Sequence, residues 1–459
     1  MVSYNTFVES RKQIGRMRDA RTFTVVLVVL YGILKEFRPS TPFLTPFLEG
    51  PTKNFSVQEL YGEIYPFWTY SYLVFLIPVF FITDLLKYKP VVVLEAASLT
   101  LTWGLLVFGK TVWQMQIMQI AFGMATSAEI AYYSYLYAVV DKRNFKKVTA
   151  YIRSAVMLGK FFGYAVAQII VTFDNGAYLL LNQITLASVS VTFVISLILQ
   201  FHKTPDNTLM PDTVQPHDAE FHETRAQKTV PKMSKNVLSE LLEAFRDPTV
   251  LSWSIWWALA SCGMYQVQNY SQSLWSPMHK AGQFMGNGVM ECITTLSTTL
   301  LTFGLQYVSF NWKKHSSTVF LTTSIFSSLL LAGMAFIQNI FVSYFFYILN
   351  STLYHVLIAA ASTTIAAQLQ SSKYSLIFGF NTFVALFLQT ALTFAVADKH
   401  GMNLPIITQF YVYSGYFAVL ALLFVPFAIF QKRFIPDEDC EDSEDSGEDK
   451  GTNNELVRM

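Results

Sequence analysis

Residues 176–201, GAYLLLNQITLASVSVTFVISLILQF, contain no charged side chain. About 20 predominantly apolar residues are enough for one helix to cross the hydrocarbon core of a bilayer. This stretch therefore predicts a membrane-spanning helix. It is followed by a polar, charge-rich stretch at 202–247, which cannot continue the span.

Eleven further apolar windows, on both sides of this stretch, predict membrane spans. Five precede it and six follow the polar stretch. The windows cover 22–47 (interrupted by prolines), 63–86, 90–109, 112–140 and 147–173, and then 248–274, 284–310, 316–337, 339–368, 373–397 and 405–430.

The overall composition agrees with a chain that lies mostly in lipid. Hydrophobic residues make up 53% of the 459 residues and charged residues 14%, against about 25% charged in a soluble globular chain. The three cysteines form no CxxC or pairing pattern. These features exclude a disordered chain, a disulfide-rich secreted domain and an ordinary soluble enzyme.

We therefore expect an all-α polytopic membrane protein with twelve transmembrane helices in two six-helix halves. This arrangement is typical of major-facilitator transporters. The predicted parts are a cytosolic N-terminus (1–21), an N-terminal six-helix bundle (22–201), a cytosolic central loop (202–247), a C-terminal six-helix bundle (248–430) and an acidic disordered cytosolic tail (431–459).

The distribution of Lys and Arg predicts the orientation, because these residues gather on the cytosolic side. With a cytosolic N-terminus, the inside segments hold 24 of them and the outside segments six, Lys35 and Arg38 among the six. Both ends of the chain are thus expected inside. The sequon at Asn54 falls in the first outside loop and predicts glycosylation there.

Ionisable residues inside the predicted spans are candidate functional groups, because charge in lipid is costly unless it faces a cavity or a partner. Glu129, Arg153, Lys160 and Glu291 belong to this set. Glu129 shares a helix face with Tyr132. That face predicts either a wet aromatic stripe for a flat ring or a structural pair between Glu129 and Arg153.

Two local patterns add to the candidates. Gly159 and Gly163 flank Lys160 at GxxxG spacing, which favours close helix packing, while Lys160 is too deep to reach the surface easily. The prolines of FRPSTPFLTPF (37–47) break the first span. Broken backbone at membrane depth predicts either a cavity lining or a re-entrant loop. His355, inside a span, favours a helix–helix contact over a proton relay.

The chain carries no GxSxG, HExxH or P-loop motif and no intramembrane His/Asp cluster. We therefore expect no enzyme activity and no cofactor, and any transport would be secondary or facilitative.

Six segments closely resemble the reduced folate carrier and thiamine transporter family, solute carrier family 19. They are FRPSTPFLTPFLEGPTKNFS (37–56), YPFWTYSYLVFLIPVFFITDLLKYKPVV (65–92), AEIAYYSYLYAVV (128–140), WWALASCGMYQVQNY (256–270), FGFNTFVALFLQT (378–390) and GMNLPIITQFYVYSGYF (401–417). The resemblance implies a plasma-membrane major-facilitator carrier that moves a water-soluble vitamin by alternating access. Its folate branch exchanges folates against organic anions, and its thiamine branch carries an organic cation.

The resemblance divides between the two branches. Glu129, Gln389, Trp68 and Thr102 look like the thiamine branch, and Trp103 is common to both. Thr41, Gln119, Phe122 and Lys160 depart from that branch. The departures remove two carboxylates and add one ammonium, so a bound cation would lose partners worth ~1.5–3 kcal/mol each.

From this comparison we predict a binding site for a pterin or pyrimidine ring. Tyr65, Trp68, Trp103 and Tyr132 would stack the ring, and Thr41, Gln119, Glu129 and Asn287 would read its polar edge. Lys160 and Arg153 would meet negative charge. A folate-like anion is favoured; thiamine, or a receptor-like binder that transports neither, are the alternatives. The expected partners are the vitamin, the bilayer and a counter-transported organic anion or proton.

Overall fold

The computed structural model describes residues 26–85, 89–139, 145–174, 176–199, 237–280, 284–307, 310–368 and 374–434. Within these ranges the regular structure is helical throughout. Residues 26–36 form the first helix. The others are η1 (Thr41–Phe43), α2 (Leu44–Glu49), α3 (Val57–Glu59), η2 (Leu60–Ile64), α4 (Pro66–Leu85), α5 (Lys89–Phe108), α6 (Val112–Val139), α7 (Phe145–Phe173), α8 (Tyr178–Ile198), α9 (Val237–Ala244), α10 (Pro248–Trp275), η4 (Ser276–Met278), α11 (Asn287–Gly304), η5 (Leu305–Tyr307), α12 (Trp312–Phe336), α13 (Ile340–Gln368), α14 (Tyr374–Val396) and α15 (Ile406–Phe434).

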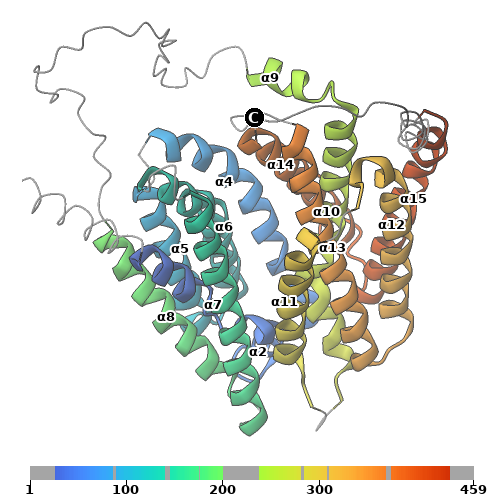
Figure 1. The fold of residues 1–459 in the computed structure, drawn as a ribbon. Helices are drawn as coiled ribbons and strands as arrows, with labels where there is room; N and C mark the ends of the chain where they lie inside the picture. The colour runs from blue at the N-terminus through green and yellow to red at the C-terminus, as the bar shows by residue number, and fades with distance from the viewer. Residues whose placement is uncertain are drawn as a thin grey trace, which may run out of the picture.

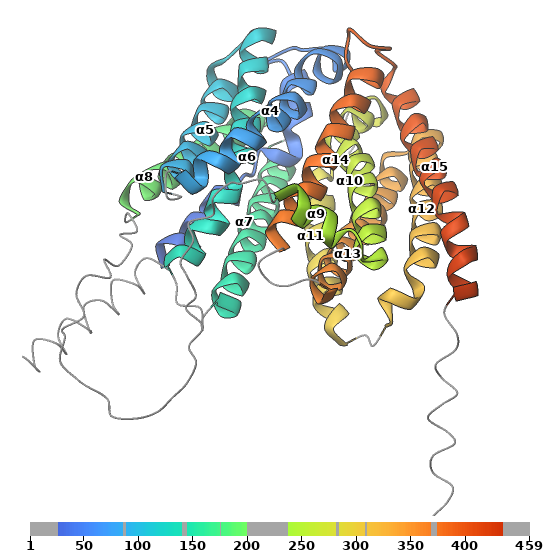
Figure 2. The ribbon, with the colours of Figure 1, turned by 90° about the horizontal axis from the view of Figure 1, so that it is seen from above.

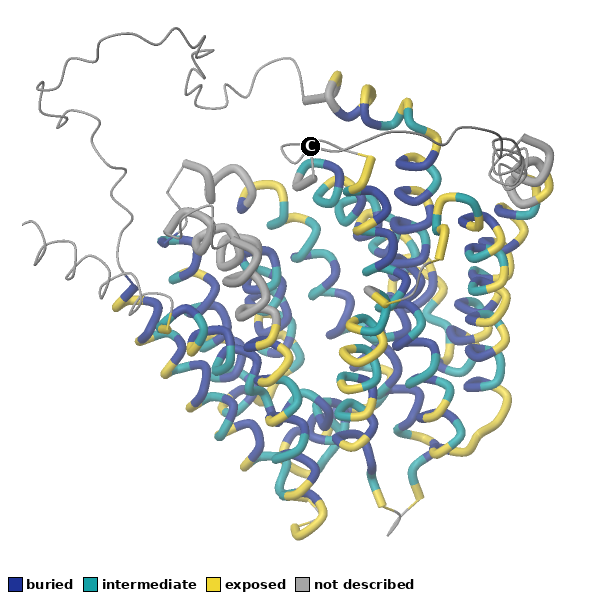
Figure 3. The backbone as a smooth tube through the Cα atoms, viewed as in Figure 1, coloured by how far each residue is buried: buried dark blue, intermediate teal, exposed yellow. Residues whose placement is uncertain are grey.

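Each predicted apolar window corresponds to a helix in this order. Seven helices in the described part of the chain are long and apolar enough to cross a membrane, α5 and α8 among them. Exposed residues lie along the outward faces of the helices (Figure 3). They include large apolar residues such as Leu197 of α8, Leu329 of α12 and Leu422 of α15. Apolar surface on this scale is stable in lipid rather than in water.

The first predicted span is broken, as its prolines indicate. The helix over 26–36 stops before Pro39, and the chain continues through the short helices η1 and α2. Pro42 occupies the first turn of η1, where its missing N–H costs no hydrogen bond. The break leaves backbone N–H and C=O groups at residues 41–45 available to other helices.

The helices form two groups that lie side by side (Figures 1 and 2). In the first group α6 packs against α4 and α5, and α5 packs against α8. In the second, α10 packs against α13 and α14, and α12 against α15. The groups meet where α7 packs against α11 and where α4 packs against α14.

The described hydrogen bonds between the two groups gather at one end of the molecule, here named the closed end. Three of them connect Asn287 Nδ2 to Pro42 O at 2.8 Å, Tyr70 to Asp398 at 2.6 Å and Lys399 Nζ to Glu63 at 2.8 Å. Toward the other end, where α9 lies, the groups diverge (Figure 1). The molecule is thus held shut at the closed end.

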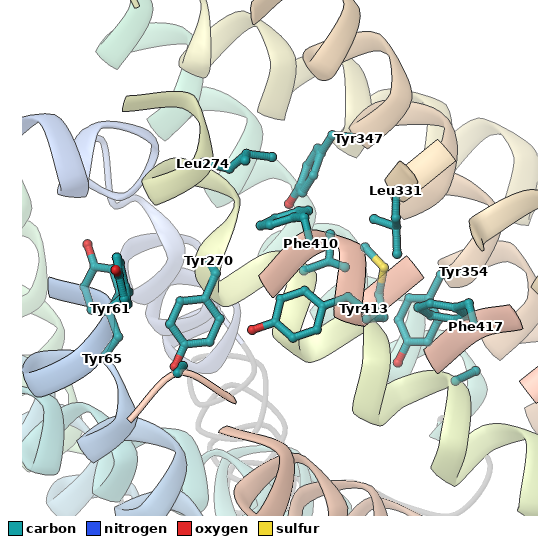
Figure 4. Close-up of a cluster of buried hydrophobic side chains, with 14 of the residues drawn as sticks. Tyr61, Tyr65, Tyr270, Leu274, Leu331, Tyr347, Tyr354, Phe410, Tyr413 and Phe417 are labelled. Atoms are coloured by element: carbon teal, nitrogen blue, oxygen red, sulfur yellow. The ribbon is translucent and has the colours of Figure 1, made fainter. Parts of the chain in front are cut away.

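Buried tyrosines continue the packing across the groups near the closed end (Figure 4). The Tyr65 ring, at the junction of η2 and α4, lies 6.4 Å from the Tyr270 ring of α10. Tyr270 in turn stacks on Tyr413 of α15 at 6.5 Å. This row joins the first group to the core of the second.

Gly159 and Gly163 are helix-packing positions, as their spacing predicted. A Cβ on Gly159 would lie 2.3 Å from the Ile33 carbonyl oxygen, and one on Gly163 would lie 3.0 Å from the Arg38 backbone nitrogen. Glycine at both positions allows α7 to approach the first helix and the broken segment closely.

We predict that Gly159→Ala destabilises the protein by about 1–3 kcal/mol, because the added methyl group overpacks a backbone contact. Gly104→Ala is the matched control, since a Cβ there meets nothing within 4 Å. The measurement is thermal unfolding of the detergent-purified variants. Equal stability of the two variants would contradict the close approach of α7.

Candidate functional site

A cavity of about 210 Å³ lies between the two groups, beside the broken segment. Its walls come from residues 40–45, α4, α5, α6 and α10. Seven predicted residues line it: Thr41, Tyr65, Trp68, Thr102, Trp103, Gln119 and Phe122. The lining also includes residues that were not predicted: Ser40, Leu44, Thr45, Leu106, Met118, Gln268, Asn269 and Gln272.

Three aromatic rings form one wall of this central cavity. The Phe122 ring stacks on Trp68 at 6.2 Å and meets Trp103 edge-on at 6.0 Å. Trp103 Nε1 donates to Ser40 Oγ at 2.7 Å, and Trp68 Nε1 donates to Thr126 Oγ1 at 3.3 Å. These hydrogen bonds fix both indoles, which line the cavity.

A partly buried guanidinium group lies beside this wall. Arg38 Cζ is 5.6 Å from the centre of the Trp103 ring and 5.8 Å from that of Phe122, within the range of a cation–π contact. Its side chain also pairs with Glu36. The topology count had assigned Arg38 to an outside loop, and the structure corrects this, because Arg38 supports the cavity wall.

Amide side chains of α10 form the facing wall. Gln272 accepts a hydrogen bond from Thr45 N at 3.1 Å and donates one to Thr41 O at 2.9 Å, so it satisfies the backbone exposed by the break. Asn269 Nδ2 is buried and has no hydrogen-bond partner within the described ranges. This wall offers a substrate hydrogen-bond donors and acceptors without charge.

Lys35 is at the centre of a buried ion cluster in the first group. Its Nζ lies 2.8 Å from Glu95 and 3.0 Å from Glu129, and Tyr31 OH donates to Glu95 at 2.8 Å. The Lys35 side chain is only 1% exposed, so it too was wrongly assigned to an outside loop. Without Lys35 and Arg38 the outside segments of the topology count hold four basic residues.

The Lys160 ammonium group lies 3.9 Å from the Glu36 carboxylate and does not line the central cavity. Lys35, Arg38 and Lys160 are thus accompanied by Glu36, Glu95 and Glu129. The sequence-based charge comparison considered neither Lys35 nor Glu36. The six charges balance, so the cluster itself supplies little net charge to a substrate.

The other predicted site residues lie away from the cavity lining. Asn287 bonds to Pro42 O and Tyr344 at the closed end, and Gln389, fully buried, donates to Thr69 Oγ1 at 3.5 Å across the α4–α14 contact. Glu291 lies on α11, also outside the described lining. The side chains of Tyr132 and Arg153 fall outside the described residues.

His355 is a helix–helix contact, as predicted. Its Nε2 lies 3.3 Å from Nε2 of Gln268, which reaches into the central cavity from α10. The contact connects α13 to the amide wall.

At the closed end, beyond the C-terminal end of α14, an ionised side chain connects the two groups. Burial opposes ionisation of Asp398, but hydrogen bonds from Tyr70 and His400 lower its pKa below the ordinary value. Asp398 therefore accepts the Tyr70 hydrogen bond as a carboxylate at neutral pH, which strengthens the connection between α4 and the end of α14.

Two helix groups that meet at one end around a central cavity are the arrangement of the major-facilitator fold. Comparison with solved structures agrees. The POT family transporter PepTSo has a TM-score of 0.65 at 12% identity, covering 90% of this chain and 99% of that one. A mutant of the nucleoside transporter NupG has a TM-score of 0.63 at 14% identity, covering 88% and 99%.

The sequence comparisons define the family more closely. The sequence model described as reduced folate carrier matches residues 21–412, and the chain belongs to that family. It is 44% identical to Folate transporter 1 of Caenorhabditis elegans, over 89% of this chain and 92% of that protein. It is 38% identical to Thiamine transporter 2 of Homo sapiens, over 88% and 89%.

Proposed function

We propose that this protein carries a water-soluble vitamin across the plasma membrane by alternating access, as a secondary or facilitative transporter and not an enzyme. The observation that carries the proposal is the central cavity, which lies between two helix groups joined only at the closed end within the described residues. A flat ring would stack on Trp68 and Phe122, and the α10 amides would bind its polar edge.

The distribution of basic residues indicates how the protein is oriented in the membrane. The closed end carries residues of the predicted outside loops. We therefore propose an inward-facing state with both termini in the cytosol. The proposed moving parts are the bundles over 22–201 and 248–430, connected by the loop over 202–247. An organic anion or a proton is the proposed counter-transported species.

A folate-like anion is the proposed substrate, because no carboxylate is among the described residues that line the central cavity and the Arg38 guanidinium lies beside its aromatic wall. Thiamine is the second candidate. It is supported by Glu129, whose side chain is 34% exposed beside Lys35 and offers a carboxylate to a cation. A receptor-like binder would hold either vitamin without moving it.

The test is uptake of labelled folate and labelled thiamine, side by side, in cells that lack their own carriers. A carrier gives saturable uptake that rises when the cells are preloaded with unlabelled substrate. Saturable thiamine uptake without folate uptake would overturn the anion proposal. Binding without net uptake of either vitamin would favour the receptor-like alternative.

We predict that Gln119→Glu combined with Lys160→Tyr shifts preference from the anion toward the cation. The change adds a carboxylate to the cavity wall and removes the ammonium group paired with Glu36, which makes the region more negative. KM for folate should therefore rise at least about tenfold and KM for thiamine should fall. Gln58→Glu adds the same charge at an exposed position and serves as the control. Unchanged KM values for both vitamins would contradict the charge argument.

We also propose that Asn54 is glycosylated. It is exposed and has a left-handed backbone conformation, φ 58°, in the loop before α3. Glycosidase treatment should increase the electrophoretic mobility of the wild-type protein and leave Asn54→Gln unchanged. Asn350→Gln is the control, because Asn350 is buried in α13; a glycosidase shift that persists in Asn54→Gln would contradict the assignment.

A further inference from the structure

A second cavity, of about 240 Å³, lies at the closed end between α2 and the helices α10, η4 and α11. Gln272 lines both this cavity and the central one. The side chain that bonds to Thr41 and Thr45 therefore forms part of the partition between the two. In the proposed orientation the second cavity is on the extracellular side, and it is named the outer cavity below.

The outer cavity contains the carboxylate of Glu49, and one of its two oxygens has no hydrogen-bond partner within the described ranges. One oxygen of Glu49 accepts a hydrogen bond from the Ser276 hydroxyl across the two groups. The other oxygen, Oε1, is buried and has no hydrogen-bond partner within the described ranges. Burial raises the pKa of Glu49, although the Ser276 hydrogen bond acts in the opposite direction. A buried carboxylate oxygen without a donor is costly, so the site favours a ligand that brings an N–H group.

The size and walls of the outer cavity fit one flat ring. Tyr178 and Trp275 line it together with Glu49. Trp275 is held by a hydrogen bond from its Nε1 to Ser343 Oγ at 2.9 Å. A cavity of about 150 Å³ is enough to hold benzene, so 240 Å³ accommodates a single substituted six-membered ring.

We propose that the outer cavity is a second substrate site, which takes an aminopyrimidine edge through paired N–H donors on Glu49. This inference rests on the proposed function, because both folates and thiamine carry a flat amino-substituted ring of this class. The N–H donors satisfy Oε1 and replace the Ser276 hydroxyl on the other oxygen. Arrival of the ring thereby weakens one contact that holds the two groups together.

The matched test is Glu49→Gln, which keeps the shape of the side chain and removes its charge. A charge-assisted hydrogen bond is about twice as strong as a neutral one, so KM for uptake from outside should rise about tenfold. KM for efflux from preloaded cells should stay unchanged, because the central cavity is intact. Glu59→Gln is the control. The Glu59 carboxylate accepts a hydrogen bond from Ser56 in the neighbouring loop, and its replacement should leave both KM values unchanged.

Equal changes of KM in both directions, or no change in either, would overturn the outer site. If wild type takes up neither vitamin, the proposed function fails, and a measurement without transport then decides the outer site.

That measurement uses His279→Cys, since His279 lines the outer cavity. A membrane-impermeant thiol reagent added outside should label it, whereas the parent chain gives the background. Millimolar 2,4-diaminopyrimidine should slow this labelling several-fold when Glu49 is present and not in the His279→Cys, Glu49→Gln double variant. No labelling above background, or equal protection of both variants, would overturn the proposal.

Discussion

Lys35→Met is expected to destabilise the folded protein by about 3–5 kcal/mol, the usual consequence of removing one partner from a buried ion pair. The substitution takes away the ammonium group that lies 2.8 Å from Glu95 and leaves that carboxylate almost fully buried. Tyr31 still donates one hydrogen bond to it, but a hydroxyl does not neutralise the charge. The measurement is thermal unfolding of purified protein together with its amount at the cell surface.

The double variant Lys35→Met, Glu95→Gln distinguishes charge from packing. It removes both members of the pair, so most of the lost stability should return. Lys110→Met is the matched control, since Lys110 is exposed, and it should behave as wild type. If Lys35→Met is as stable as Lys110→Met, the buried cluster does not support the first group as described.

An intramolecular disulfide between Gln168→Cys and Gly288→Cys is expected to abolish uptake. A Cβ on Gly288 of α11 would lie 2.9 Å from Cβ of Gln168 on α7, close enough for a disulfide after a small relaxation. Gln168 already connects the helices, since it accepts from Val289 N at 3.1 Å and donates to Met285 O at 3.0 Å. A covalent bond here prevents separation of the groups at the closed end.

Each single cysteine variant should transport under the same oxidising conditions, and a reductant should restore uptake by the double variant. The single variants also control for Cys292, one helical turn from Gly288. Full uptake by protein that is quantitatively cross-linked would contradict opening at this end, and with it the proposed transport cycle.

The fold could be predicted from the sequence because lipid imposes a simple rule, a long apolar window for each spanning helix. The windows at 90–109 and 176–201 coincide closely with α5 and α8. The break in the first span was also predictable, because Pro39 and Pro42 exclude a continuous helix. Its consequence was not, since a linear sequence does not say which helix satisfies the freed backbone.

The sequence predicted the aromatic side of the candidate site and three polar lining residues, Thr41, Thr102 and Gln119. Trp68, Trp103 and Phe122 stood out through the family resemblance, and they lie together in the structure. The amide wall was missed, although Gln268 and Gln272 stand four residues apart inside an apolar window and so share one helix face. Lys35 and Arg38 were wrongly placed in the outside segments, because charged residues next to a proline-rich break in a span are typical of a loop.

The proposed transport requires a vitamin to bind against the aromatic wall of the central cavity. Its most direct test is the KM for uptake of the transported vitamin by Trp68→Ala, with Trp113→Ala as control, because Trp113 is 59% exposed on α6. Loss of a stacking ring typically costs about 1–3 kcal/mol. At equal amounts of protein at the cell surface, we therefore predict a KM at least about fivefold above wild type for Trp68→Ala. The KM of Trp113→Ala should be unchanged. An unchanged KM in Trp68→Ala would contradict the account.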